Sequence, residues 1–168
     1  MDVNKTVELW DLYDEFKNKL NQDQVRGQKI PNGCYHLVAH VWIKNDKEEF
    51  LISKRSLNKR SYPLFWECPG GSVQKGETTY EASIRETMEE VGVNLENKNG
   101  KFITSFVRRD IQDIVDVYLF RCNGKSNLTL ATTDEVIETI WATKEEILKL
   151  YQDNKLMPTL KYFFDLDI

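Results

Sequence analysis

The sequence predicts a single mixed α/β (α+β) domain that spans residues 1–168 and contains a substantially antiparallel β-sheet. A length of 168 residues is sufficient for one domain with a sizeable core and too short for two ordinary domains. Hydrophobic residues make up 40% of the chain, which is typical of a globular protein. The expected elements run as strands, a helix, strands and then helices, and this order disfavours a regularly alternating parallel sheet.

Six segments rich in Val, Ile, Phe, Tyr and Trp are expected to form the strands of this sheet. They cover residues 6–13, 35–43, 49–54, 102–109, 113–121 and 136–142. Turn-forming dipeptides separate some of them, including Asn32-Gly33 before the second strand and Asn45-Asp46 before the third.

Helical periodicity is present in residues 79–91, in residues 144–152 and, more weakly, in residues 160–166. The first helix is well delimited, because Thr78 and Glu81 match a capping box and Gly92 stands where a glycine ends a helix. At about 100° per residue, one face of this helix is expected to pack and the opposite face to be acidic. The packing face comprises Tyr80, Ile84, Thr87, Met88 and Val91, and the acidic face comprises Glu86, Glu89 and Glu90.

Composition excludes several classes of protein. The net charge of −4 and the pI near 5.3 argue against a binder of nucleic acid polymers or anionic membranes. The longest apolar stretch, residues 37–43, is much shorter than the ~20 residues of a transmembrane helix, and the start of the chain lacks a signal-peptide pattern. Three cysteines without a close pair fit reduced thiols, so we expect a cytoplasmic protein.

The two histidines, His36 and His40, both lie in the apolar strand expected over residues 35–43. Histidines in such a position are more often packed and hydrogen-bonded than ligands. We therefore expect no metal centre based on histidine.

Charges are distributed unevenly along the chain. Residues 77–96 hold six acidic residues and one basic residue, a local net charge of −5. Just upstream, residues 51–66 have a local net charge of +4, contributed by Lys54, Arg55, Lys59 and Arg60. An acidic cluster beside a basic segment is compatible with a phosphate-bearing substrate, provided that cations neutralise the carboxylates.

Three carboxylates of the first helix are placed against the usual preferences of a solvated helix. Glu86 and Glu90 form a like-charge pair four residues apart, which costs about 0.2–0.5 kcal/mol. Glu89 and Glu90 also lie in the last turn, where the helix dipole favours cations. Carboxylates at this spacing offer the oxygen ligands that hard divalent cations prefer, so the sequence predicts a site for Mg²⁺ or Mn²⁺.

A glycine loop precedes this acidic helix at a fixed spacing. Gly71 is followed after five residues by Glu77 and, after seven more, by Arg85-Glu86-Thr87-Met88-Glu89-Glu90-Val91-Gly92-Val93. This segment resembles the Nudix box, and all seven invariant positions of that motif match. One departure is Thr87, where the motif prefers an aliphatic residue. The resemblance covers residues 71–93 and implies the Nudix fold, a mixed β-sheet sandwiched between α-helices.

The resemblance implies a hydrolase that cleaves a pyrophosphate bond of a nucleoside diphosphate derivative, or of a similar small molecule, by metal-assisted attack of water. The residues implied to hold Mg²⁺ or Mn²⁺ are Gly71, Glu77, Glu86, Glu89 and Glu90. Arg85 is implied to orient neighbouring carboxylates through bidentate hydrogen bonds. The implied partner is a small phosphate-containing substrate, and a homodimer is compatible with the resemblance because Nudix proteins are often dimers.

A carboxylate has to accept the proton of the attacking water. Glu90 is the best candidate within the motif, and Glu89 and Arg85 complete the expected catalytic group. In some members of the family the base lies outside the motif, and the candidates outside it here are Glu67, Asp116 and Glu135.

The basic segment before the glycine loop is expected to contact the substrate. Arg55 above all is placed to bind phosphate oxygens that the metal leaves uncovered. Glu67, close to the loop, is a second candidate for substrate binding. No cofactor other than the metal is expected.

Two alternative functions remain open. Residues 35–67 also resemble isopentenyl diphosphate isomerase, a Nudix-fold enzyme that moves a double bond and hydrolyses nothing. His36 and Trp42 match positions of that pattern, but Gly70 stands where the isomerase carries a catalytic cysteine, and Cys68 is two positions away. The second alternative is a non-catalytic Nudix ligand-binding module, although such modules usually lose carboxylates of the motif and none is missing here.

Overall fold

The computed structural model describes residues 7–168. In chain order its strands are β1 (Leu9–Tyr13), β2 (Lys19–Val25), β3 (His36–Lys44), β4 (Phe50–Arg55), β5 (Trp66–Glu67), β6 (Gly70–Ser72), β7 (Lys101–Arg108), β8 (Asp113–Arg121) and β9 (Val136–Ala142). Its helices are α1 (Thr79–Val91), α2 (Lys144–Gln152) and the 3₁₀ helix η1 (Pro158–Asp165).

A mixed sheet is built around β3, whose two edges carry different partners. β8 runs parallel to β3 along its whole length, beginning with His36 opposite Asp113. On the other edge, β6 pairs antiparallel with residues 38–40, and β4 meets β3 at the pair Lys44 and Phe50. β7 pairs with β8, and β5 and β9 pair with β4. Because β6 occupies the edge that β4 leaves, the sheet splits beside β3.

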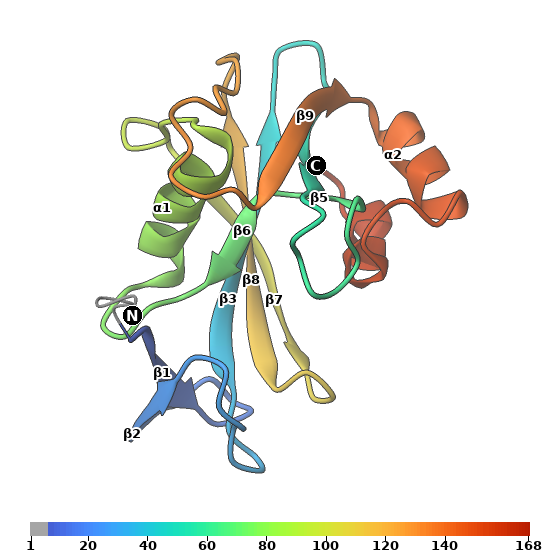
Figure 1. Cartoon of the computed structure of the whole chain (residues 1–168). Helices are drawn as coiled ribbons and strands as arrows, with labels where there is room; N and C mark the ends of the chain where they lie inside the picture. Colours follow the sequence, from blue (N-terminus) through green and yellow to red (C-terminus); the bar gives the residue numbers. More distant parts are fainter. Residues whose placement is uncertain (1–6) are drawn as a thin grey trace.

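Helices cover both faces of this sheet (Figure 1). α1 lies on one face, where Val91 packs with Val41 and Phe120. α2 and η1 lie on the other face, and there the rings of Trp42 and Phe163 stack with centroids 3.9 Å apart. The structure confirms the predicted arrangement, a mixed sheet between helices.

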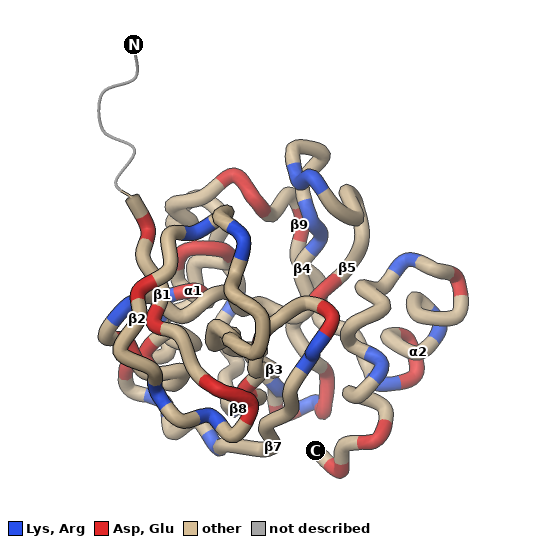
Figure 2. The backbone as a smooth tube through the Cα atoms, turned by 90° about the horizontal axis from the view of Figure 1, so that it is seen from below, with Lys and Arg blue, Asp and Glu red and all other residues tan. Residues whose placement is uncertain are grey.

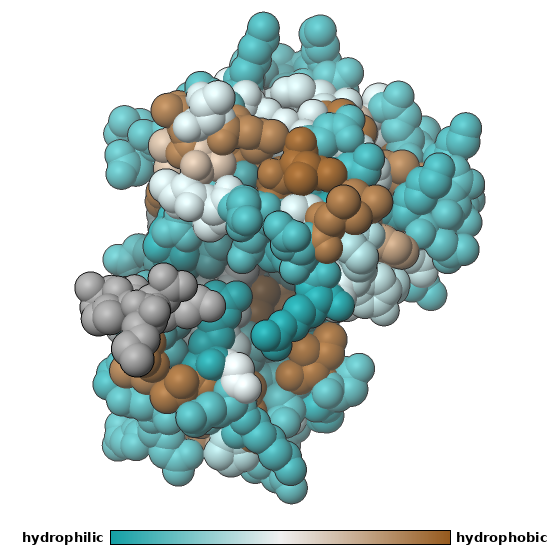
Figure 3. All heavy atoms as spheres, viewed as in Figure 1, coloured by the Kyte–Doolittle hydropathy of each residue, from teal (hydrophilic) through white to brown (hydrophobic). Residues whose placement is uncertain are grey.

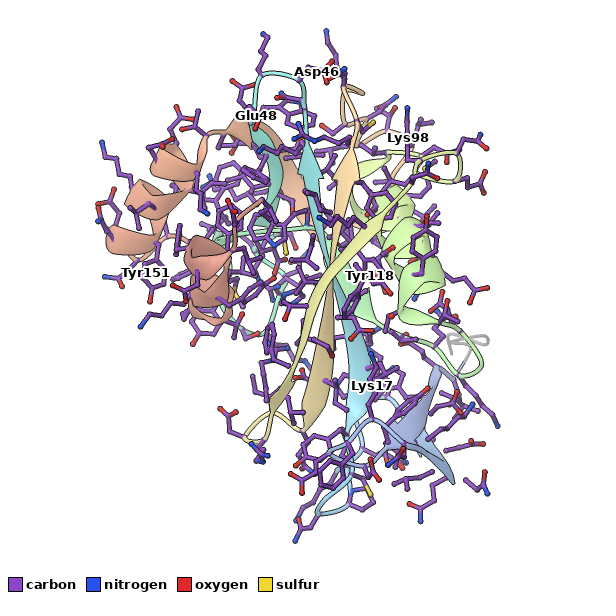
Figure 4. The ribbon with its side chains drawn as sticks, turned by 180° about the vertical axis from the view of Figure 1, so that it is seen from behind. Lys17, Asp46, Glu48, Lys98, Tyr118 and Tyr151 are labelled. Atoms are coloured by element: carbon purple, nitrogen blue, oxygen red, sulfur yellow. The ribbon has the colours of Figure 1, made fainter. Side chains whose placement is uncertain are left out.

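β1 and β2 form a separate antiparallel hairpin below the main sheet (Figure 1). Tyr13 and Tyr35 exchange two backbone hydrogen bonds, of 2.8 and 2.9 Å, which join the hairpin to the residue before β3. Lys17, labelled in Figure 4, forms an ion pair with Asp116 of β8 at 2.5 Å. These contacts hold the hairpin beside the start of α1.

Most predicted elements are confirmed, and the differences have physical causes. α1, α2, β8 and β9 have the predicted bounds. The first predicted strand is shorter, since β1 begins at Leu9, and Thr6 lies outside the described residues. β2, β5 and β6 were not predicted, because β2 is mostly polar and the other two are short. The last predicted helix is a 3₁₀ helix that begins at Pro158. Within the described residues, no helix has the length and apolar character needed to cross a membrane.

Candidate active site

The glycine strand β6 leads into α1 and lies very close to β3. At Gly70 an added Cβ would collide with the carbonyl oxygen of Ala39, so a side chain there would push the two strands apart. Downstream, Thr78 caps α1: its hydroxyl accepts from the N–H of Glu81 at 3.2 Å, and its own N–H donates to the Glu81 carboxylate at 2.8 Å. Gly92 ends the helix with a φ of 65°, as the sequence predicts.

Arg85 gathers the acidic residues of the motif around its guanidinium. It donates to both carboxylate oxygens of Glu77 at 2.8 Å, to Glu86 at 2.8 Å and to Glu89 at 3.1 Å. Its Nη2 also donates to the carbonyl oxygen of Ser72 in β6 at 3.1 Å. Burial lowers the pKa of Arg85, but the bond to Glu77 and the charge of Glu86 outweigh it and raise the pKa above its usual range. Arg85 therefore fixes three carboxylates relative to the glycine strand.

Glu90 is the carboxylate of this helix that faces inward. Only 5% of it is exposed, and its Oε2 accepts from the N–H of Gly70 at 3.1 Å. Burial raises the pKa of Glu90 well above its ordinary value, and the charges of Glu67 and Glu86 raise it further. The helical periodicity predicts Glu90 on an acidic face opposite the packing face, whereas the structure buries it against the glycine strand.

The expected packing face of α1 was wrong in part. Thr87 and Val91 are buried as expected, and the half-buried Tyr80 and Ile84 pack against the cluster around Val91. Met88 is half-buried and, with one side of Ile84, lines an open groove along the outer side of the helix. The residues that α1 turns toward the sheet are mostly small, and they are Thr79, Ala82, Ser83 and Thr87. Small side chains let the helix approach β3 and β6 closely, which carries Glu90 into the interior.

A cavity of about 240 Å³ lies where the sheet splits, between β6, α1 and the loops before β5 and β9. Its carboxylates are Glu8, Glu67, Glu86, Glu89, Glu90 and Glu135, and its cationic side chains are Arg26, Arg55, Lys59 and Arg85. In Figure 3 this face of the molecule is hollowed near its centre, and the atoms around the hollow are mostly hydrophilic. The structure thus brings motif residues together with both predicted substrate-binding residues, Arg55 and Glu67.

The basic segment upstream of the motif is largely paired with carboxylates. Arg55 donates to both oxygens of Glu67, at 2.9 and 2.8 Å, and to the carbonyl oxygen of Ser61 at 2.9 Å. Lys59 is paired with Glu135. Figure 2 shows the same mixture over the chain, with basic and acidic residues interspersed. Two of the four basic residues of this segment therefore form ion pairs with carboxylates that line the cavity.

Two residues of the N-terminal hairpin also line the cavity, and sequence reasoning missed them. Arg26 follows β2 and forms an ion pair of 2.7 Å with Glu8, which precedes β1. The side chain of Arg26 is 54% exposed, more than Arg55 at 11%. No motif marks either residue. Predicting their place at the cavity would have required predicting that β1 pairs with β2.

Of the three candidate bases outside the motif, two line the cavity and one does not. Glu67 and Glu135 line the cavity with Glu90. Burial raises the pKa of Glu67, while Arg55 opposes that rise. Asp116 lies elsewhere, where it accepts hydrogen bonds from Lys17 and, at 2.6 Å, from the hydroxyl of Thr79.

The donor set around the cavity suits a hard divalent cation. In the part of the chain that the structure describes, no three His, Cys, Asp or Glu side chains already form a metal-ligating cluster, since Arg85 attracts Glu77, Glu86 and Glu89. Glu90, however, is a buried carboxylate with like charges around it, and cations offset such repulsion. An added Cβ at Gly71 would lie 2.6 Å from the carboxylate carbon of Glu86, so the Gly71 backbone lies directly against a second donor. The residues present therefore fit such an ion.

Comparison with known proteins identifies the family. The NUDIX domain family matches residues 35–164. The chain is 36% identical over 163 residues to a protein of Listeria innocua described as an uncharacterized Nudix hydrolase, with 94% of this chain and 91% of that protein covered. It is also 39% identical over 65 residues to the isopentenyl-diphosphate Delta-isomerase of Salmonella heidelberg, but this match covers 38% of this chain and 36% of the isomerase.

A solved structure agrees at the level of the fold. The crystal structure of DR0079 from Deinococcus radiodurans is similar with a TM-score of 0.74 and 23% sequence identity, over 89% of this chain and 91% of that one. The family match spans most of the chain and contains the whole arrangement around Arg85. The chain therefore belongs to the Nudix hydrolase family.

Proposed function

We propose that this Nudix hydrolase cleaves the pyrophosphate bond of a nucleoside diphosphate derivative or a similar small phosphate-containing molecule, with Mg²⁺ or Mn²⁺ bound. The observation that carries the proposal is the position of Glu90. It is a buried carboxylate, surrounded by other carboxylates and bonded to the glycine strand, in a cavity that also presents arginine and lysine side chains. Such a site suits a cation together with a polyanionic substrate.

The residues that would hold the ion are Gly71, through its backbone, and the carboxylates Glu77, Glu86, Glu89 and Glu90. When bound, Mg²⁺ or Mn²⁺ would neutralise phosphate oxygens, polarise phosphorus and lower the pKa of the attacking water. Arg85 would act as a positioning residue, because its hydrogen bonds keep Glu77, Glu86 and Glu89 in place.

Glu90 would accept the proton of the attacking water at a carboxylate oxygen. Its raised pKa makes it a stronger base than an exposed glutamate, which suits general-base catalysis near neutral pH. Glu89 would assist from the same end of the helix. Glu67 and Glu135 are alternative bases, since both line the same cavity.

Cationic side chains at the cavity would bind the phosphate oxygens. Arg55 is nearly buried and tied to Glu67 and Ser61, so it would present a fixed guanidinium edge. Lys59 and the more exposed Arg26 would add charge near the opening. Glu67, bonded to Arg55, would contribute to substrate binding by orienting it.

One alternative is favoured by a specific observation, the local similarity to isopentenyl-diphosphate Delta-isomerase. Gly70 lies against β3 in the position matched to the catalytic cysteine of the isomerase. The nearest thiol, Cys68, is buried, and burial raises its pKa, which disfavours a reactive thiolate. Since neither Gly70 nor Cys68 supplies a reactive thiolate at this position, hydrolysis is the better proposal.

The proposal is tested by a screen of purified protein with Mg²⁺ and with Mn²⁺. The substrates are nucleoside di- and triphosphates, dinucleoside polyphosphates, nucleotide sugars and isopentenyl diphosphate, and released phosphate or pyrophosphate is measured. We expect metal-dependent release from at least one nucleotide, abolished in Glu90→Gln and retained in Glu96→Gln, an equal charge change at an exposed position outside the cavity. Isomerisation of isopentenyl diphosphate without phosphate release would favour the isomerase, and tight binding without turnover would favour a ligand-binding module.

A further inference from the structure

A second cavity, of about 300 Å³, adjoins the first at the glycine strand. The two cavities share Glu67, Gly70 and Gly71. Because the two glycines carry no side chains, a molecule whose phosphates lie by the carboxylates can extend past β6 into this second space. The volume is at the lower end of the roughly 300–1,000 Å³ found for small-molecule sites.

The second cavity is mainly apolar, and its charged groups are already paired. Its apolar side chains come from β3, the β7–β8 turn and the chain around the start of η1, and they are Val38, Ile111, Met157 and Leu160. Arg108 donates to Asp113 at 2.7 and 2.6 Å, and Glu67 accepts from Arg55. An uncharged group is therefore a better occupant than a phosphate.

His40 also lines this cavity. Two residues on the side of the ring away from the cavity, Trp42 and Tyr162, determine which of its nitrogens carries the proton. The indole N–H of Trp42 can only donate, and it donates to the hydroxyl of Tyr162 at 3.2 Å. The Tyr162 hydroxyl, which accepts that bond, lies 2.8 Å from Nδ1 of His40 and can donate its own proton there. Assigning the Tyr162 proton to this bond makes Nδ1 the acceptor and places the proton of the neutral imidazole on Nε2.

The rest of the environment keeps this arrangement in place. The rings of His40 and Tyr162 stack with centroids 5.7 Å apart, which restricts rotation of the imidazole. Burial and the charge of Arg108 lower the pKa of His40 to about 3, so the ring is neutral near neutral pH. In the described part of the chain Nε2 has no hydrogen-bond partner, and it is not among the enclosed polar atoms that lack one. An oriented N–H donor is thus available in a mainly apolar cavity.

The geometry points to His40 as a specificity-determining residue, whose Nε2–H donates to an acceptor on a nucleobase-sized heteroaromatic ring seated in the second cavity. Such a ring is uncharged, has apolar faces and carries acceptors on its edge, which matches both the lining and the donor. Tyr162 is a positioning residue that acts through His40. The assignment rests on the proposed function in one respect, because the pyrophosphate of the same molecule would lie by the carboxylates across β6.

Equilibrium binding separates this inference from catalysis. The probes are the four common nucleoside monophosphates and ribose 5-phosphate, which has the same sugar and phosphate without a base, titrated calorimetrically with Mg²⁺ present, since none of them contains a pyrophosphate bond. We expect at least one nucleotide to bind the wild-type protein tenfold or more tightly than ribose 5-phosphate. His40→Phe should weaken nucleotide binding by about 10- to 100-fold, the worth of one buried hydrogen bond, and leave ribose 5-phosphate unchanged.

Three further variants make the result specific. His40→Gln, which retains a side-chain N–H donor, should restore part of the nucleotide affinity. Tyr162→Phe should weaken nucleotide binding in the wild-type background and have no further effect in His40→Phe. His36→Phe is the matched control, because it makes the same replacement on the same strand at a residue stacked on Trp10 and outside both cavities. If His40→Phe does not fold, Tyr162→Phe carries the test.

Two results would overturn the assignment: equal affinity of wild type for nucleotides and ribose 5-phosphate, or unchanged nucleotide affinity in both His40→Phe and Tyr162→Phe. The hydrolysis screen distinguishes this failure from failure of the proposed function. Base discrimination that depends on His40 without any turnover would contradict only the hydrolase proposal. Turnover without such discrimination would contradict only the role of His40.

Discussion

The backbone N–H of Gly70 donates a hydrogen bond to Oε2 of Glu90 across 3.1 Å. This contact joins the glycine strand to the last turn of α1, and it places a buried carboxylate within the cavity wall. Burial and the like charges raise the pKa of Glu90 more than the N–H of Gly70 and the charge of Lys59 lower it. The raised pKa of Glu90 is the basis of the first prediction below.

Glu90→Gln should lower turnover by about 10²- to 10⁴-fold, because the proposed base is lost while the amide oxygen can still accept from Gly70. In metal-free buffer the variant should be more stable than wild type. A raised pKa means that the stability contributed by Glu90 is present at low pH and is lost as the pH rises above the ordinary value of 4.5. Thermal melts at about pH 5 and about pH 8 check this, and an advantage of the variant that shrinks with rising pH would contradict it.

Gly71→Ala should strongly lower activity and leave the fold intact. Its Cβ would lie 2.6 Å from the carboxylate carbon of Glu86, so that side chain would have to move away from the glycine strand. The expected loss in kcat/KM is about 100-fold or more, since misplacement by about 1 Å has effects of this size. Gly124→Ala is the control, because its Cβ would meet only the sulfur of Cys122 at 3.2 Å. Equal activity of the two variants would exclude the close packing of Gly71 and Glu86 as a catalytic requirement.

Arg85→Lys should destabilise the protein and impair the site together. Lysine cannot reproduce the simultaneous bonds to Glu77, Glu86 and the carbonyl oxygen of Ser72. We expect a loss of roughly 1.5–3 kcal/mol in unfolding free energy, measured by chemical denaturation without metal. A variant with wild-type stability and wild-type activity would show that the guanidinium does not organise the carboxylates.

Mg²⁺ should raise the melting temperature of the wild-type protein through binding linkage. At a concentration about 100 times its dissociation constant, the stabilisation is about 2.7 kcal/mol. Glu89→Gln should reduce this response, whereas Glu145→Gln, an exposed position on α2, should not. A response of equal size in wild type and Glu89→Gln would place the ion elsewhere.

The stability of the wild-type protein should fall in acid relative to His40→Gln. Burial and Arg108 lower the pKa of His40 from its ordinary value of 6.5 to about 3. Between these values the unfolded chain binds a proton that the folded chain does not, so folding weakens as the pH falls. The difference between the two proteins should change by about 1.4 kcal/mol per pH unit in this window. A constant difference across it, in urea unfolding curves, would contradict a neutral buried imidazole.

The sequence was sufficient for elements whose ends are determined locally. α1 and α2 each begin at a capping box, formed by Thr78 with Glu81 and by Thr143 with Glu146, and both have the predicted bounds. β8 was predicted with the same accuracy because it is rich in β-branched and aromatic residues and lies, largely buried, between two neighbouring strands.

Features that depend on contacts distant in sequence were not predictable. Helical periodicity separates two faces, but it does not say which elements cover each face, so Glu90 was placed on the wrong side. Likewise, the polar strand β2 exists because it pairs with β1, and this pairing is what brings Arg26 to the cavity. That Arg85 would bond to neighbouring carboxylates was predicted, since one arginine stands among several acidic residues of the motif. Which carboxylates it contacts, Glu77 among them, was not.

The hairpin that carries Glu8 and Arg26 lies outside residues 35–164, the part of the chain matched by the family. Glu8 and Arg26 line the cavity, although neither is a residue of the motif. Mutations there can alter which molecules enter while the carboxylates and Arg85 stay unchanged. Substitutions in this hairpin can therefore change the opening of the cavity independently of the carboxylates that Arg85 holds.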